Sequence, residues 1–231
     1  MIIAPSLLAG DYGKFASEAR RIARSGADWT HLDIMDGNFV PNISFGPEVV
    51  RVVRAQSKMF LDVHLMCTKP EILLESFQKA GANQLTVHVE LGEKVDGLLW
   101  KIRSMGCKVG LAVNPPTSIS TVRPYLEQVD NLLVMTVNPG FGGQEFIYET
   151  LPKIQQVAAW RASLSADFHI QVDGGINLST AGECVRAGAD AFVSGSDLFS
   201  QRSLRAGIQK LRKAIEKAQA ASLPTLPAHN A

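Results

Sequence analysis

The chain has 231 residues, of which 46% are hydrophobic, and its 23 basic and 22 acidic side chains leave a formal charge of only +1. Without blocks of basic residues, no surface for nucleic acid or for an anionic membrane is expected. No apolar run approaches the roughly 18 residues that span a bilayer. The amino terminus lacks a secretory signal, and the three cysteines form no Cys-x-x-Cys pair. These features predict a cytoplasmic protein without disulfides or a cysteine zinc site.

Hydrophobic periodicity and turn residues divide the first half of the chain into alternating strands and helices. Strands are predicted at residues 2–8, 29–35, 59–66 and 84–88. Helices are predicted at residues 11–24, from Pro47 onward, and at residues 70–81. The long loop at residues 36–47 is rich in turn formers. Because long ordered loops in compact domains are often functional, this loop is a candidate part of a site.

The same alternation continues through the second half of the chain. Strands are predicted at residues 108–113, 131–135, 168–173 and 191–194. Helices are predicted at residues 94–105, 118–126, 145–161, 179–186 and 203–220. The last residues, 221–231, show no pattern and are predicted to be a disordered tail. We therefore expect one catalytic domain over residues 1–220.

Eight strand signals that alternate with eight helix signals favour parallel βαβ units over an antiparallel sheet. No linker rich in Pro, Gly or Ser divides the chain before its tail. A single closed (β/α)8 TIM barrel fits both the strand count and the length. A doubly wound open sheet is the alternative fold, but the Gly-x-Gly-x-x-Gly fingerprint is missing after the first strand.

Histidine and aspartate side chains lie near the carboxyl ends of several predicted strands. Successive side chains of a strand alternate between faces, so His31 and Asp33 share one face. A barrel gathers the carboxyl ends of its strands around one mouth, which brings in His64 and Asp173. Two imidazoles and two carboxylates form a mixed site suited to a divalent ion such as Zn²⁺, Fe²⁺ or Mn²⁺. The alternative is that the histidines are hydrogen-bonded core residues and Asp33 caps a turn.

Other residues near the strand ends have less specific interpretations. His88 is expected to be structural, and His169 lies at the wrong end of its strand to join the cluster. Three methionines, at positions 35, 66 and 135, either fill the core or form an apolar floor that excludes water from the site. The sequence leaves both interpretations of the methionines open.

Glycine-rich pairs follow the last three strands, at residues 142–143, 174–175 and 195–196. Glycine lets backbone N–H groups approach an anion, and a helix amino terminus adds a favourable dipole. Barrels often bind phosphate with their last loops and a short extra helix, for which residues 197–199 are the candidate. Together these features indicate a phosphorylated substrate.

Five stretches, at residues 3–8, 31–42, 62–66, 135–144 and 172–176, resemble the ribulose-phosphate 3-epimerase family. The resemblance runs over residues 1–218. It implies a TIM barrel of the ribulose-phosphate-binding type and an isomerase of the pentose phosphate pathway. Such an enzyme interconverts D-ribulose 5-phosphate and D-xylulose 5-phosphate by two-base proton transfer through an enediolate.

The resemblance also implies roles for individual residues. His31, Asp33, His64 and Asp173 would hold one divalent metal ion per chain, Zn²⁺, Fe²⁺, Mn²⁺ or Co²⁺. Asp33 and Asp173 would also be the catalytic acid and base. Substrate contacts are implied at Ser6, His64, Gly140, Phe141, Gly142, Gly143, Asp173, Gly174, Gly175, Gly195 and Ser196.

Three rival functions use a similar barrel. A 3-epimerase of a hexulose phosphate such as allulose 6-phosphate would need the same groups. A decarboxylase of the orotidine phosphate type would need an Asp-x-Lys-x-x-Asp constellation, but His64 stands where the lysine would be. A non-catalytic sugar-phosphate-binding barrel leaves both carboxylates unexplained. The expected partner is a small phosphorylated ketose, with no nucleic acid or membrane, and the chain is expected to form a homo-oligomer.

Overall fold

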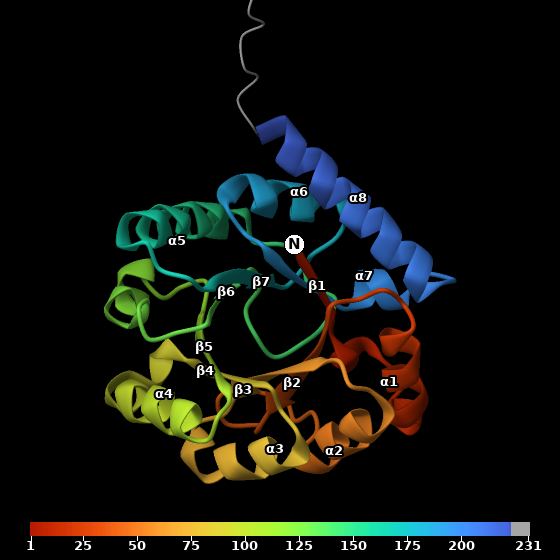
Figure 1. Ribbon diagram of the computed structural model, residues 1–231, viewed down its shortest axis with the longest axis horizontal. Helices are drawn as coiled ribbons and strands as arrows, with labels where there is room; N and C mark the ends of the chain where they lie inside the picture. Colours follow the sequence, from red (N-terminus) through yellow and green to blue (C-terminus); the bar gives the residue numbers. More distant parts are fainter. Residues whose placement is uncertain (223–231) are drawn as a thin grey trace, which may run out of the picture.

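The structure is a computed structural model that describes residues 1–222. Figure 1 looks along a barrel whose strands lie inside a ring of helices. The eight strands form one parallel sheet in the order β1-β8-β7-β6-β5-β4-β3-β2. The two ends of this sheet meet where Ser6 bridges to His31 and the N–H of Asp28 donates to the carbonyl of Ile3 at 3.0 Å. The predicted TIM barrel is confirmed.

The strands are short and buried, as expected for a parallel sheet whose outer face is covered by helices. They are β1 Ile2–Pro5, β2 Trp29–Met35, β3 Phe60–Met66, β4 Gln84–His88, β5 Lys108–Val113, β6 Asn131–Met135, β7 His169–Asp173 and β8 Ala191–Ser194. The bounds of five strands are those predicted, whereas β1 ends three residues early. It ends because the Ser6 side chain accepts a hydrogen bond from the N–H of Leu8 and starts a 3-10 turn.

The helices on the outside are α1 Phe15–Ala23, α2 Pro47–Gln56, α3 Leu74–Ala80, α4 Val95–Ser104, α5 Leu151–Leu164, α6 Leu178–Ala187, α7 Ser196–Phe199 and α8 Leu204–Ser222. The predicted helix at 118–126 is instead the 3-10 helix Ile119–Tyr125, which contains Pro124, a residue without a backbone N–H. The predicted helix from residue 145 starts only at Leu151, with a proline in its first turn.

The last helix, α8, extends to Ser222, past the predicted helix end at residue 220, and packs beside α6 (Figure 1). The remainder of the predicted tail, residues 223–231, lies outside the described residues. Over residues 1–222, no helix is both long and apolar enough to cross a membrane.

The register between β2 and β3 sets the site. Cα partners across this pair are His31 with Asp62, Asp33 with His64, and Met35 with Met66. Side chains of one strand alternate, so these three pairs all point to the same face of the sheet. The parallel register therefore places the chemical groups of two strands side by side inside the barrel.

Candidate metal centre and active site

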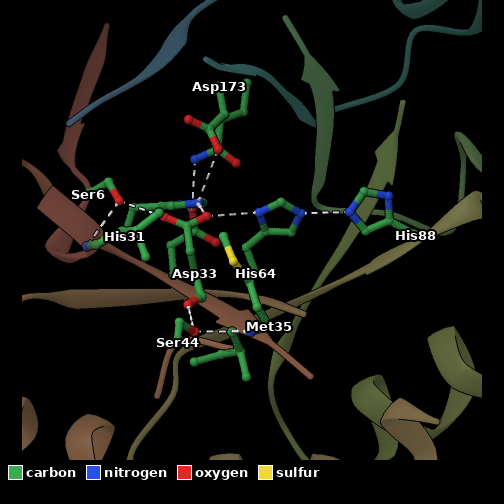
Figure 2. A network of polar contacts seen from close by, with 12 residues as sticks. Ser6, His31, Asp33, Met35, Ser44, His64, His88 and Asp173 are labelled. Atoms are coloured by element: carbon green, nitrogen blue, oxygen red, sulfur yellow. Dashed lines mark hydrogen bonds and ion pairs between the residues drawn. The ribbon is translucent and has the colours of Figure 1, made fainter. Parts of the chain in front are cut away.

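Four side chains from three strands meet at the barrel mouth (Figure 2). β2 supplies His31 and Asp33, β3 supplies His64, and β7 supplies Asp173. The Oδ1 atom of Asp33 lies 3.2 Å from His31 Nε2 and 3.2 Å from His64 Nδ1. The Oδ2 atom of Asp173 lies 3.8 Å from His31 Nε2. One potential ligand atom from each residue lies within 4.8 Å of all the others.

This spacing fits a bound divalent ion. Four ligands at about 2.0–2.1 Å in a tetrahedral site lie about 3.3 Å from one another. The observed separations of 3.2, 3.2 and 3.8 Å are close to that value. The donors, two imidazole nitrogens and two carboxylates, suit the borderline and hard ions Zn²⁺, Fe²⁺, Mn²⁺ and Co²⁺. The four residues therefore form a donor set that could hold a divalent metal ion.

Neighbouring polar groups orient two of the four side chains. The Ser6 hydroxyl donates to Asp33 Oδ2 at 2.5 Å. On the other side of His31, the Nδ1 atom lies 2.7 Å from Asp62 Oδ2. The amides of Gln84 and Gln171 donate to the same Asp62 carboxylate, at 2.8 and 2.6 Å. The imidazole of His31 is therefore held between two carboxylates inside the barrel.

The environment separates the pKa values of the two carboxylates that face the mouth. Burial, with the nearby negative charge of Asp33, raises the pKa of Asp173 to about 7. Burial alone would raise the pKa of Asp33 too, but the positive charge of His31 and its hydrogen bond to Asp33 hold it far below its usual range. Asp33 is thus ionised over the whole neutral range, whereas Asp173 gains and loses its proton around pH 7.

The two imidazoles also differ. Burial opposes the charge on His31, but the carboxylates of Asp33 and Asp62 outweigh burial and raise its pKa well above the ordinary value. Burial instead dominates at His64 and lowers its pKa to about 4. His64 is therefore a neutral ring, the form in which an imidazole nitrogen can offer a lone pair to a metal ion.

A cavity of about 720 Å³ opens above the cluster. This volume lies in the range of small-molecule sites. Every residue predicted to contact substrate lines the cavity except His64, which is completely buried beneath it. Met35, Met66 and Met135 also line it. The methionines therefore form part of the apolar floor of the site.

The loops around the cavity are fixed to one another. Gly175 has a φ of +65°, and a Cβ atom there would lie 2.7 Å from the backbone nitrogen of Phe146. Only glycine lets the loop after β7 approach the loop after β6 so closely. The Asn42 side chain donates to the carbonyl of Gly140 at 2.7 Å and joins the 36–47 loop to the same region. The rim of the cavity is thus preorganised.

Sequence reasoning overlooked one group and undervalued another. Asp62 received no role, although it precedes His64 by two residues and so shares its strand face. His88 was expected to be structural, yet its Nε2 lies 2.8 Å from His64 Nε2. His169 is at the far end of β7, where it pairs with Asp190 at 3.1 Å, as its position predicted.

Comparison with known proteins gives both sequence relatives and a fold relative. The profile of the ribulose-phosphate 3 epimerase family matches residues 2–199. The ribulose-phosphate 3-epimerase of Bacillus subtilis (strain 168) is 40% identical over 211 residues, 91% of this chain and 97% of that protein. The cytoplasmic isoform from Oryza sativa subsp. japonica is 41% identical and covers 94% of this chain and 95% of its own length. A crystal structure of 3-hexulose-6-phosphate synthase covers 93% of this chain and 100% of its own, with TM-score 0.67 and 16% identity, which shows a shared fold alone.

Proposed function

This chain belongs to the ribulose-phosphate 3-epimerase family and is an isomerase, and we propose that it interconverts D-ribulose 5-phosphate and D-xylulose 5-phosphate through two carboxylates. The observation that carries the mechanism is the pair Asp33 and Asp173, which face one cavity with the pKa of Asp33 lowered and that of Asp173 raised to about 7. Pairs of titratable groups whose environments separate their pKa values mark an acid and a base.

Inversion of C3 next to a ketone requires removal of a proton from one face and delivery of a proton to the other. Asp33 is ionised and accepts the C3 proton of one epimer, while Asp173 carries a proton and donates it to the opposite face. Between β2 and β7 lie β1 and β8, so the two carboxylates reach the cavity from different sides. The roles exchange in the reverse direction.

The other residues of the site serve this proton transfer. When bound by His31, Asp33, His64 and Asp173, a divalent ion supplies positive charge that stabilises the enediolate oxygens. The Ser6 hydroxyl orients Asp33 through its hydrogen bond to Oδ2. The apolar methionine floor excludes water, which would otherwise exchange protons with the enediolate.

The phosphate end of the substrate is assigned to the glycine-rich loops after β6, β7 and β8. Gly143, Gly175 and Ser196 all line the cavity, and their backbone N–H groups suit an anion. The family relationship favours the five-carbon ketose phosphate over a six-carbon one such as allulose 6-phosphate. Unphosphorylated ribulose should therefore be a far poorer substrate, and turnover with similar kcat/KM would contradict the assignment.

The biological setting is proposed from the relatives. We place the reaction in the pentose phosphate pathway and the protein in the cytoplasm, since a relative that is 41% identical is a cytoplasmic isoform. A homo-oligomer remains a prediction, which size-exclusion chromatography with light scattering would test.

The two-base assignment is tested by replacing each carboxylate with an amide. Asn keeps the shape of Asp but cannot take up a proton at neutral pH, so Asp33→Asn and Asp173→Asn should each lower epimerisation by about 10²–10⁴-fold. The two variants should differ in partial reaction, one exchanging the C3 hydrogen of ribulose 5-phosphate with deuterated water and the other that of xylulose 5-phosphate. Mass spectrometry of each recovered ketose phosphate measures this exchange.

Metal content must be measured in each variant, because both residues are also proposed ligands. Asp96→Asn, on the exposed side of α4, is a matched control for the loss of one carboxylate and should retain wild-type activity. If both site variants keep one metal ion per chain and exchange both epimers at wild-type rates, the two-base assignment is wrong. Full activity of the wild-type protein after exhaustive chelation, with no metal found, would refute the metal site.

A further inference from the structure

A row of buried side chains leads away from His64, on the side opposite Asp33. The His64 Nε2 atom lies 2.8 Å from the Nε2 atom of His88, the last residue of β4 (Figure 2). The Nδ1 atom of His88 then lies 3.0 Å from Glu90 Oε2. Both histidines are completely buried. The row Asp33–His64–His88–Glu90 therefore connects the candidate metal centre to a carboxylate outside it.

The far end of the row is anchored. The Glu90 Oε1 atom accepts a hydrogen bond from the backbone N–H of Asn114 at 2.8 Å. Although burial opposes its charge, hydrogen bonds from His88 and Thr117 lower the pKa of Glu90 to about 2. Glu90 is thus an ionised carboxylate that can only accept hydrogen bonds.

Packing fixes the ring of His88 between two neighbours. Its centroid lies 5.0 Å from that of His64, with the two rings edge to edge and their planes 24° apart, and 4.7 Å from that of Phe39. Phe39 lies in the 36–47 loop. The ring of Phe39 therefore packs this loop against His88.

The contacts along the row favour one arrangement of protons. A contact between two imidazole nitrogens is a hydrogen bond only when one of them carries the hydrogen. Because Glu90 is an acceptor, a hydrogen on His88 Nδ1 donates to it, and His88 Nε2 is then free to accept. In this arrangement His64 donates from Nε2 to His88 Nε2, which leaves a lone pair on Nδ1. That lone pair faces the cluster of Asp33, His31 and Asp173.

The opposite arrangement is disfavoured. If His64 carried its hydrogen on Nδ1, His88 would have to donate from Nε2 and would turn a bare Nδ1 toward the Glu90 carboxylate at 3.0 Å. That arrangement would replace a charge-assisted hydrogen bond at 3.0 Å with a repulsion between two acceptors, and in the metal-free protein it would gain only the longer contact of 3.2 Å from His64 Nδ1 to Asp33 Oδ1. It would also remove the lone pair of His64 from the metal centre.

We propose that His88 and Glu90 are positioning residues that keep the hydrogen of His64 on Nε2 and so direct its Nδ1 lone pair to the metal ion. The proposal rests on the metal site proposed above. In this proposal, the two metal-binding imidazoles are oriented by different carboxylates. His31 contacts the carboxylate of Asp62 directly, whereas His64 reaches the carboxylate of Glu90 through His88. Partners of this kind raise metal affinity by fixing the tautomer of the ligand.

The test replaces Glu90 with Gln, which keeps the size of the side chain and removes its charge. Glu93→Gln is the matched control, since Glu93 is an exposed glutamate in the same 3-10 segment, Val89–Lys94. Two quantities are measured on each protein. Long-range ¹⁵N–¹H correlation spectra of the metal-free protein report which nitrogen of His64 carries the hydrogen, with the signals assigned through a His64→Asn variant. Competition with a chelator gives the Kd for Zn²⁺.

The wild-type protein and Glu93→Gln should show His64 protonated on Nε2 and should bind Zn²⁺ equally. Glu90→Gln should give a mixture of the two tautomers and bind Zn²⁺ about 10–100-fold more weakly. His88→Phe, which preserves the ring packing against Phe39 and removes both nitrogens, should show the same two changes. A purely structural role of Glu90 would lower the melting temperature without changing the tautomer.

The possible failures can be distinguished. If His64→Asn abolishes Zn²⁺ binding while Glu90→Gln matches Glu93→Gln in both tautomer and Kd, the metal site stands and the positioning role is wrong. If His64→Asn binds Zn²⁺ as tightly as the wild type, the metal site itself fails. A metal-free wild-type protein with the His64 hydrogen on Nδ1 overturns the positioning role, whatever the affinity for metal.

Discussion

The carboxylate of Asp62 should be a principal source of stability in the metal-free protein. It is completely buried and accepts hydrogen bonds from His31 Nδ1 at 2.7 Å and from the amides of Gln84 and Gln171 at 2.8 and 2.6 Å. Asp62→Leu puts a larger, apolar side chain in place of the carboxylate and removes every acceptor. It leaves three buried donors without partners, one of them on an imidazole whose pKa is raised well above its ordinary value.

The expected cost follows from these hydrogen bonds. Each buried donor left unsatisfied costs about 1–3 kcal/mol, and removal of one partner from a buried ion pair costs about 3–5 kcal/mol. Apolar packing of the leucine side chain offsets part of this, so a loss of about 3–5 kcal/mol is expected. In a domain of this size, 1 kcal/mol shifts Tm by about 2–4 °C, which gives a decrease of roughly 6–20 °C.

Asp62→Asn is the matched comparison. Asparagine keeps an oxygen that can accept from His31 and Gln171. Its amide N–H can donate to the side-chain oxygen of Gln84 once that side chain has rotated. It should therefore cost clearly less than Asp62→Leu. Urea unfolding of the chelator-treated proteins, followed by circular dichroism, measures both losses without the added stabilisation of a bound metal ion. If the leucine variant unfolds at the same urea midpoint as the asparagine variant, the buried hydrogen bonds do not stabilise the barrel as reasoned.

Two further variants probe packing and pH dependence. A Cβ atom on Gly110 would lie 2.0 Å from Thr86 Oγ1, so Gly110→Ala should lower the unfolding free energy by about 1–3 kcal/mol. Gly97→Ala, which meets open space, should not lower it, and equal urea midpoints for the two would contradict the packing argument. Burial opposes the charge of Asp36, but hydrogen bonds from Phe39, Thr68 and Asn38 lower its pKa to about 2 from 3.8. The stability that this carboxylate adds is therefore present above about pH 4 and is lost as the pH falls toward 2. Asp36→Asn should be destabilised at pH 6, and the difference from wild type should shrink between pH 4 and 2. A difference that is constant with pH would show that the charge of Asp36 is not involved.

Much of the fold follows from local sequence features. Hydrophobic periodicity and the turn residues between elements were enough to predict the observed bounds of five strands, β2, β4, β5, β6 and β8. The errors occur where a hydrogen bond or a proline overrides periodicity. Ser6 ends β1 early, and Pro124 converts a predicted helix into a 3-10 helix. A hydrophobic pattern alone does not show where a side-chain hydrogen bond or a proline will end an element.

The sequence by itself determined which groups share a strand face. His31 and Asp33 lie two residues apart on β2, and so do Asp62 and His64 on β3, because side chains of a strand repeat every two residues. The recognisable motifs also tied the chain to its family, which the relatives confirm.

Only the tertiary structure decided how those faces meet. Closure of the barrel brings Asp173 within 3.8 Å of His31 and joins Asp62 to Gln171, 109 residues later in the chain. The surroundings inside the barrel then separate the pKa values of Asp33 and Asp173. The pairing of β3 with β4 also places His88 within 2.8 Å of His64. Strand periodicity acts over a few residues and can be read from sequence. Desolvation and contacts between distant strands depend on the closed barrel as a whole, so they exist only after the chain has folded.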